Sequence, residues 1–248
     1  MPTKKPTDYF DETLAKRLAE NIATVYAHFD HASFVNAVAT NYTDKSLKQR
    51  VELIADQLHS FLPDDYQRAV NILMDILGPE NEEETGMFTR FYWVMPVAKY
   101  VEKYGLEHLS VSMTAIEEIT KRNTGEYAIR PFIRTYPDQT LEQMKRWAVS
   151  ENFHLRRLAS EGLRPKLPWA TKLDVFTENP QPVFDILNLL KEDPVHFVKK
   201  SVANHVTDYL KVNPEAAADL IEDWSESSNE HTRWILHYAT RKQRKKSG

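Results

Sequence analysis

The sequence predicts an all-α fold, because three observations agree. Apolar residues recur at steps of three and four along most of the chain, as in helices that bury one face. No segment shows convincingly the period-two alternation that a half-buried strand requires. Glycine is scarce, with 6 among 248 residues, so the tight turns of closely spaced β-hairpins are rarely available.

The helices can be placed in chain order from this spacing. The segment 47–62 is the clearest, with Leu47, Val51, Ile54, Leu58 and Leu62 on one face. The same spacing predicts helices over 12–28, 33–39, 66–77, 88–104, 108–121, 140–149, 182–191 and 215–224. Gly78 and Pro79 should end the helix over 66–77. Pro96 should kink or split 88–104, because it removes a backbone donor and clashes with the preceding turn.

Four further helix starts in the second half resemble one another. They are Ala-Ile-Arg-Pro-Phe-Ile (128–133), His-Leu-Arg-Arg-Leu-Ala (154–159), Phe-Val-Lys-Lys-Ser-Val (197–202) and His-Thr-Arg-Trp-Ile-Leu (231–236). Aligning them places Arg130, Arg156, Lys199 and Arg233 at equivalent positions, 26, 43 and 34 residues apart. Helical hairpins of this size stack into a curved solenoid, which sets equivalent residues in a row along one face. The alternative is that amphipathic helices share this register by chance.

Composition narrows the class of protein. The chain has no cysteine, so disulfides, thiol chemistry and cysteine-bound metals are excluded. No apolar run approaches the length of a membrane span, and the first residues lack the apolar segment of a signal peptide. We therefore expect a soluble, cytoplasmic and monomeric protein with one helical domain over residues 1–248.

The two halves of the chain differ in charge. Residues 1–120 carry 11 Lys and Arg against 19 Asp and Glu, whereas residues 121–248 carry 21 against 17. A basic half is the usual mark of a polyanion partner, although charges that merely solvate helix faces explain it as well. The basic tail 241–248 either extends a polyanion-binding surface or is a solvated helix end.

The segment 150–170 concentrates the side chains that a nucleic-acid surface uses. Four cations and an aromatic ring lie within little more than a dozen residues: Arg156, Arg157, Arg164, Lys166 and Trp169. A break at Pro165 and Pro168 follows the helical part and presents the ring. Cations beside an exposed ring suit a phosphate chain with a cationic or aromatic group next to it.

Three motifs in this half resemble one known family. They are Leu155-Arg-Arg-Leu-Ala-Ser-Glu-Gly-Leu-Arg-Pro-Lys-Leu-Pro-Trp-Ala, Gly125-Glu-Tyr-Ala-Ile-Arg-Pro-Phe and Val198-Lys-Lys-Ser-Val-Ala-Asn-His-Val-Thr-Asp. They are similar to motifs of the AlkC branch of the AlkC/AlkD DNA alkylation repair glycosylases. The resemblance is dense over 115–240 and thin over the N-terminal helices of 1–110. Lys166 departs from the motif, where Arg is more usual.

The resemblance implies a right-handed α-α superhelix of HEAT-like repeats whose concave face holds double-stranded DNA. It also implies excision of cationic methylated purines such as 3-methyladenine, without metal or cofactor and without rotating the lesion into a pocket. Some relatives carry an immunoglobulin-like domain, and this chain resembles the shorter form that lacks it.

The resemblance also assigns roles to residues. An anion near the sugar stabilises the positive charge that builds as the glycosidic bond breaks, and Glu126 is the first choice and Asp208 the second. Trp169 would pack on the sugar or the damaged nucleotide. The remaining candidates would contact DNA, mainly its phosphates: Arg130, Arg156, Arg157, Arg164, Lys166, Lys199, Lys200, Arg233 and Trp234.

The residues alone leave other interpretations open. Glu126 could cap a helix, Asp208 could pair with Lys211, and Trp169 could fill a core gap. Arg157 could form an ion pair with Glu161, four residues on. Asn204 and His205 are motif positions to which we assign no role. Two other functions also fit: a non-catalytic protein that binds unusual DNA structures, and a HEAT-type scaffold that binds proteins.

Overall fold

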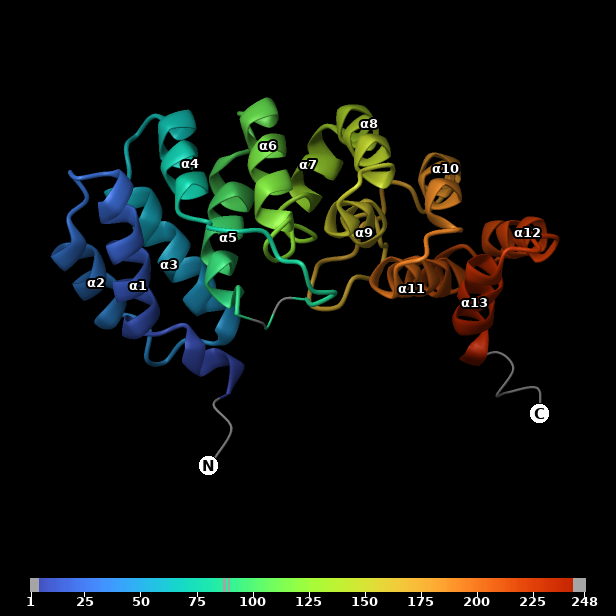
Figure 1. Cartoon of the computed structure of the whole chain (residues 1–248), viewed down its shortest axis with the longest axis horizontal. Coiled ribbons are helices and arrows are strands. Elements are labelled where there is room, and N and C mark those ends of the chain that lie inside the picture. The colour runs from blue at the N-terminus through green and yellow to red at the C-terminus, as the bar shows by residue number, and fades with distance from the viewer. Residues whose placement is uncertain (1–4, 87, 89, 243–248) are drawn as a thin grey trace. The chain divides into compact units, whose positions relative to one another are not determined.

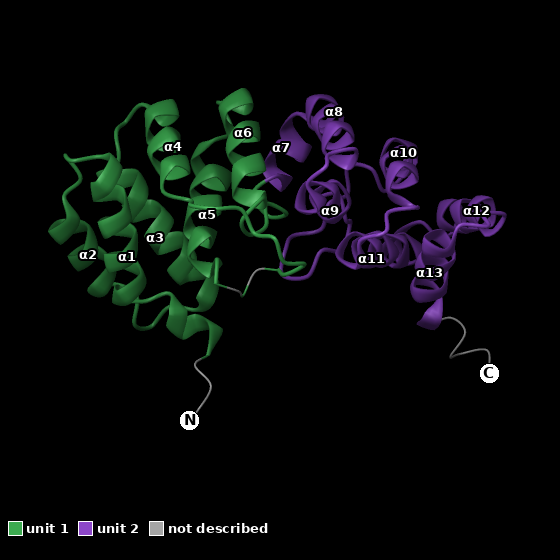
Figure 2. Cartoon of the chain, viewed as in Figure 1, with its two compact units in different colours: residues 1–128 green, residues 129–248 purple. Residues whose placement is uncertain are grey.

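The computed structural model describes residues 5–86, 88 and 90–242, and these residues form helices and connecting loops without a β-strand (Figure 1). The predicted all-α fold is therefore confirmed. The chain divides into two compact units, residues 1–128 and residues 129–248 (Figure 2). The single domain over 1–248 stays a prediction. Within the basic tail, residues 243–248 lie outside the described residues.

Unit 1 is built from short helices that pack on their neighbours in the chain. In order they are η1 (Pro6–Tyr9), α1 (Glu12–Val25), α2 (His31–Ala39), α3 (Leu47–Phe61), α4 (Tyr66–Asp75), η2 (Tyr92–Val94), α5 (Met95–Tyr104) and α6 (Leu109–Thr120). Helix α1 packs on α2, α2 on α3, and α3 on α5, whereas α6 packs on both α4 and α5. Each helix buries the apolar face that its spacing predicts, with Leu14, Ile54 and Leu73 fully buried.

Local signals set the ends of these helices. Asp11, Asp30 and Asp65 accept backbone N–H groups in the first turns of α1, α2 and α4, which satisfies donors that have no partner inside the helix. Pro96 occupies the first turn of α5, where its missing N–H costs nothing, and the predicted helix 88–104 is split into η2 and α5. Gly78 follows α4 with a φ of 71°, in the left-handed region that glycine tolerates.

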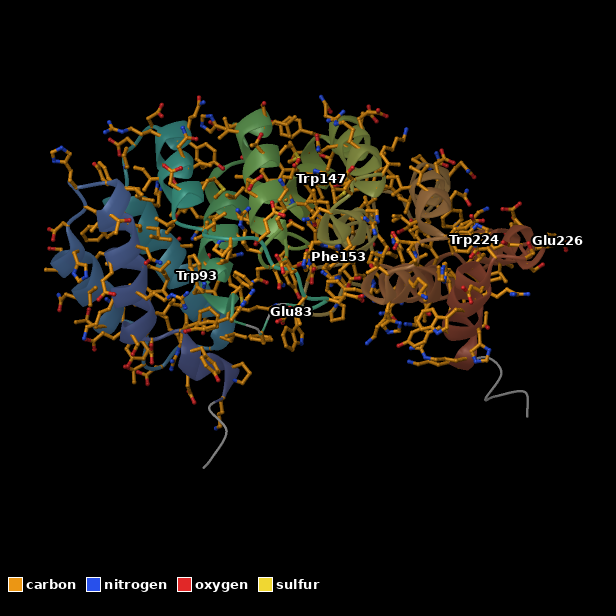
Figure 3. All side chains as sticks on the ribbon, viewed as in Figure 1. Glu83, Trp93, Trp147, Phe153, Trp224 and Glu226 are labelled. Atoms are coloured by element: carbon orange, nitrogen blue, oxygen red, sulfur yellow. The ribbon has the colours of Figure 1, made fainter. Side chains whose placement is uncertain are left out.

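The described residues of unit 2, up to residue 242, form one short helix and three helical hairpins. Its helices are α7 (Arg130–Thr135), α8 (Pro137–Ala148), α9 (Phe153–Glu161), α10 (Gln181–Leu190), α11 (His196–Val212), α12 (Pro214–Ser225) and α13 (Glu230–Ala239). The first helices α8 and α10 pack together, and the second helices α9, α11 and α13 pack in a row (Figure 2). Trp147 and Trp224, which Figure 3 labels, are buried on α8 and α12.

The three hairpins confirm most of the register predicted from the sequence. Arg156, Lys199 and Arg233 are each the fourth residue of their helix, on α9, α11 and α13. Asn152 and Asn229 cap α9 and α13 with their side chains, as the polar turns before these helices suggest. Arg130 departs from the register, because it is the first residue of α7.

Candidate functional site

Trp169 lies on the surface of unit 2, in the loop that connects α9 to α10. Its side chain is 62% exposed, so the interpretation of this residue as core filling is wrong. Its φ is 63°, a left-handed conformation that is costly for a bulky side chain. Leu167 and Leu173 are buried on either side of it, and Leu173 N–H donates to Pro165 O at 3.1 Å. The loop is anchored at its base, and its backbone turns the indole outward.

Arg130 ties this loop to α7. Its guanidinium donates to the carbonyl oxygens of Gly162 at 3.1 Å, Arg164 at 2.9 Å and Thr171 at 2.7 Å, and the side chain is buried. Arg134, one turn later, donates to Thr171 Oγ1 and to Lys172 O. The predicted phosphate contact of Arg130 is therefore wrong: its guanidinium is directed at the backbone of the Trp169 loop, away from solvent.

A buried ion-pair cluster joins α9 to α11. Arg164 donates to Glu161 Oε1 at 2.7 Å and to Asp208 Oδ2 at 2.9 Å, so one guanidinium bridges two carboxylates. Arg157 lies 3.6 Å from Glu161 Oε1, which confirms the suggested ion pair. The Glu161, Asp208 and Arg164 side chains are at most 9% exposed. Arg164 is therefore not a surface phosphate contact as predicted, since both edges of its guanidinium face carboxylates inside unit 2.

The structure confirms the suggested pairing of Asp208 with Lys211 and does not exclude a catalytic role for this carboxylate. Lys211 Nζ lies 3.6 Å from Asp208 Oδ1, as the helical spacing suggested. Lys211 is largely exposed, so this pair is weak beside the buried bridge to Arg164. Asp208 is thus a buried carboxylate on α11 held mainly by Arg164.

The ion pairs keep this cluster charged. Burial alone would raise the pKa of the Glu161 carboxyl, but Arg157, Arg164 and the hydroxyl of Ser201 outweigh it and hold the pKa below its usual range. Burial would likewise lower the pKa of Arg164, but Glu161 and Asp208 outweigh it and raise that pKa. Glu161 therefore remains an anion at neutral pH despite its burial.

Hydroxyl groups lie behind the cluster. Ser201 Oγ is 2.6 Å from Glu161 Oε2 and 3.1 Å from Ser160 Oγ, which in turn is 3.5 Å from Nδ1 of His205. His205 is fully buried, and burial, followed by the nearby Arg164, lowers its pKa to about 3. His205, a motif position without an assigned role, thus contributes a neutral ring to the core beside this cluster.

The remaining predicted cations of unit 2 differ in how firmly they are held. Arg156 is anchored, because it donates to Asp193 Oδ2 at 2.5 Å and to the carbonyls of Ser150 and Glu151. Lys200 and Arg233 are exposed and form no ion pair within 5–86, 88 and 90–242. Arg157 also lies over the ring of Phe197 at 4.5 Å.

A column of cations and rings runs across α11 and α13. Lys199 Nζ lies 5.5 Å from the ring centre of Trp234, Trp234 stacks on Tyr238 with centroids 5.1 Å apart, and the Arg241 guanidinium lies 3.6 Å over Tyr238. Lys199 Nζ is also 3.3 Å from Nδ1 of His231. The rings hold the two terminal cations in place without neutralising them, which suits an anionic partner. Lys166 lies half-buried at the start of the Trp169 loop.

Glu126 belongs to unit 1 and is buried in the segment after α6. Its carboxylate accepts the hydroxyl hydrogen of Thr124. Gly125 packs tightly on α6, since a Cβ there would meet Thr120 Oγ1 at 2.5 Å and Ile116 Cγ2 at 2.9 Å. The following helix has Ile129 as its N-cap and no side-chain cap, so the interpretation of Glu126 as its capping residue is wrong.

Sequence reasoning gave Glu161 only a structural role and missed Ser160 and Ser201. One signal was available, because Glu161 and Arg164 stand three residues apart around the end of a helix. The serines lie on different helices, α9 and α11, and only the packing of these helices brings them together. Among the described residues no group of three or more His, Asp or Glu side chains is placed to hold a metal ion.

Comparisons with known proteins identify the family. The chain is 32% identical over 235 residues to the uncharacterized protein YhaZ of Bacillus subtilis (strain 168), covering 94% of this chain and 63% of that protein. It is also similar to the solved structure of Pseudomonas fluorescens alkylpurine DNA glycosylase AlkC bound to DNA containing an abasic site analog. That likeness has a TM-score of 0.86 at 32% identity and covers 96% of this chain and 64% of that one. The chain thus spans just under two thirds of the length of both relatives.

A more distant solved structure, AlkD2 from Streptococcus mutans, is 20% identical with a TM-score of 0.41. No helix in the described residues has both the length and the apolar composition needed to cross a membrane. Residues 98–243, more than half of the chain, match the sequence model of the family described as DNA alkylation repair enzyme. The chain therefore belongs to the DNA alkylation repair enzyme family.

Proposed function

We propose that this protein is a DNA glycosylase that excises cationic N-alkylated purines, such as 3-methyladenine, from double-stranded DNA without flipping the base. Membership of the family and the likeness to AlkC support this activity. We further propose that it acts as a monomer in the cytoplasm and needs no metal or cofactor.

One observation carries the proposal. The segment 161–171 joins two features that such a reaction needs. At its start, Glu161 and Arg164 form a buried cluster with Asp208, and in the loop that follows, Trp169 exposes its indole. Arg130 binds carbonyl oxygens at both ends of this loop, so the carboxylates and the ring are held by one rigid segment.

The chemistry follows from the leaving group. A cationic alkylpurine leaves readily, and positive charge builds on the deoxyribose as its bond breaks. Carboxylates fixed in a desolvated site stabilise that charge and orient the attacking water. We assign this role to Glu161 and Asp208 of unit 2, with Glu126 of unit 1 as a separate candidate, and we assign Trp169 to packing against the sugar or the damaged nucleotide.

The cations then hold the DNA backbone. The proposed phosphate contacts are Arg156, Arg157, Lys166, Lys199, Lys200 and Arg233. The ring of Trp234 holds Lys199 through a cation–π contact. Such contacts position the duplex and make its affinity depend on salt, without selecting a sequence. Arg130 and Arg164 act inside the protein instead.

The experiment that tests the proposal is release of 3-methyladenine from methylated duplex DNA without added metal. The wild type should release the base, and Glu126→Gln, Glu161→Gln and Asp208→Asn should each slow release about 100-fold or more while DNA affinity changes little. The control is Glu142→Gln, which alters an exposed carboxylate on α8 that is paired only with Lys145. Tight, salt-sensitive binding without release by the wild type would instead favour a non-catalytic DNA-binding protein.

A further inference from the structure

The two oxygens of the Glu161 carboxylate face different partners. Oε1 lies 2.7 Å from Arg164 and 3.6 Å from Arg157, which are cations. Oε2 lies 2.6 Å from the hydroxyl of Ser201 on α11. Ser201 is buried, with 2% of its surface exposed. This oxygen therefore depends on a neutral donor from another helix.

The distances assign the hydroxyl hydrogen of Ser201 to Glu161. A hydroxyl carries one hydrogen, and Ser201 Oγ is placed to donate to Glu161 Oε2 at 2.6 Å or to Ser160 Oγ at 3.1 Å. The shorter contact, to a charged acceptor, commits this hydrogen to Glu161. Nδ1 of His205 lies 3.5 Å from Ser160 Oγ.

The surroundings of the two ring nitrogens favour one tautomer of His205. Nδ1 carries the hydrogen, and Nε2 carries a lone pair. Nε2 is buried and has no hydrogen-bond partner within the described residues, which an acceptor tolerates better than an N–H donor would. The imidazole stays neutral because burial lowers its pKa to about 3. Ser160 and His205 thus line the buried surroundings of the Ser201 hydroxyl, whose hydrogen goes to Glu161.

We propose that Ser201 is a positioning residue that keeps Glu161 ionised and correctly oriented for base excision. The catalytic consequence depends on the proposed glycosylase function, whereas the hydrogen bond from Ser201 to Glu161 does not. Without the Ser201 hydroxyl, Oε2 loses its donor in a buried site, and the protonated form of Glu161 gains relative to the carboxylate.

The groups that face Glu161 from each packed element are few. Arg157 and Arg164 come from α9 and the residues that follow it, and both favour the carboxylate. From α11 come Ser201, which donates to Glu161, and Asp208, a like charge that Arg164 separates from it. Removing Ser201 leaves both arginines in place, so the carboxyl should titrate at a higher pH without losing its ion pairs.

The first measurement is the pKa of Glu161 itself, by NMR of protein labelled with carbon-13 at glutamate carboxyl groups. Ser201→Ala should raise this pKa by about one unit or more, whereas Ser160→Ala, which leaves the Ser201 hydroxyl on Glu161, should not raise it. The matched control is Thr207→Val on the same helix, which removes a buried hydroxyl bonded to the carbonyls of Ala203 and Ala239 and not to Glu161. An unchanged Glu161 pKa in Ser201→Ala would overturn the proposal.

The second measurement is the pH profile of 3-methyladenine release. Because the carboxylate is the active form, the acid limb of the profile should move to higher pH in Ser201→Ala by the same amount as the pKa, and stay in place in Thr207→Val. A raised pKa with an unmoved acid limb would refute the positioning role. Absence of release by the wild type would refute the glycosylase function alone, and the NMR titration would still decide whether Ser201 holds Glu161.

Discussion

Arg130 donates a 2.7 Å hydrogen bond to the carbonyl oxygen of Thr171, across 41 residues of sequence, and so fastens the loop of Trp169 to α7. The same guanidinium binds the carbonyl of Arg164, whose side chain bridges two carboxylates. One buried cation thereby connects the exposed ring to the ion-pair cluster. Loss of the Arg130 guanidinium should therefore affect both the Trp169 loop and the ion-pair cluster.

Replacing Arg130 by lysine should loosen the Trp169 loop. Lysine keeps the charge but cannot donate to three separate carbonyl oxygens from a planar group. We expect a loss of about 2–3 kcal/mol in unfolding free energy and faster hydrogen exchange at the Leu173 amide. Arg146→Lys, on the exposed surface of α8, is the control. Unaltered exchange at Leu173 in Arg130→Lys would mean that the loop keeps its conformation without the hydrogen bonds from Arg130.

The backbone at Trp169 makes glycine and alanine unequal replacements. A left-handed φ of 63° strains any residue with a Cβ, and glycine relieves that strain. The free energy of unfolding of Trp169→Gly, measured by urea titration, should therefore be about 1 kcal/mol higher than that of Trp169→Ala. Both variants should lose excision, since both lack the indole. Equal stability of the two would show that the loop relaxes to another conformation once the ring is gone.

His205 should make the fold sensitive to mild acid. Its pKa is about 3 in the folded protein, against an ordinary value of 6.5, so between these values the unfolded chain binds the extra proton. Stability therefore falls as the pH falls below 6.5, by up to about 1.4 kcal/mol per pH unit. Urea unfolding at pH 7 and pH 5 measures this slope. His205→Gln should flatten it, whereas His28→Gln, at an exposed position, should not.

The column on α11 and α13 should contribute directly to the salt dependence of DNA binding. Removing one phosphate contact lowers the slope of log affinity against log salt by about 0.9. Lys199→Ala should show this loss, and Trp234→Ala a smaller one, because the ring only holds the cation. Lys145→Ala on α8, whose partner is Glu142, should leave the slope unchanged. If Lys199→Ala also leaves it unchanged, Lys199 does not contact a phosphate.

The periodicity of apolar residues predicted the helices because the buried face of each helix is set by residues that are close together in the sequence. Val51, Ile54 and Leu58 alone indicate which face of α3 is buried, and Pro96 alone indicates where α5 begins. The fourth-residue register of Arg156, Lys199 and Arg233 was readable for the same reason. The sequence could not distinguish buried cations from exposed ones. Arg130 and Arg233 stand in similar sequence motifs, but Arg130 is buried and Arg233 is exposed.

The partners of the buried charges depend on packing between elements distant in sequence. Arg164 meets Asp208 across 44 residues and Ser201 meets Glu161 across 40, and no local pattern encodes either pair. The conformation of Trp169 is equally non-local, because Arg130 and Arg134 hold the loop from α7. Of the contacts within the candidate site, the sequence therefore predicted only the local pairs Arg157–Glu161 and Asp208–Lys211.

If the proposed function holds, the unequal anchoring of Arg156 and Arg233 gives these two cations different roles in binding DNA. Exposed, unpaired cations such as Arg233 and Lys200 create an attractive field in solvent, which speeds the first encounter with a polyanion and fades as ions screen it. Arg156, already fixed by Asp193 and two carbonyls, loses little freedom when a phosphate arrives. Added salt should thus lower the association rate of DNA more than it raises the dissociation rate of the complex.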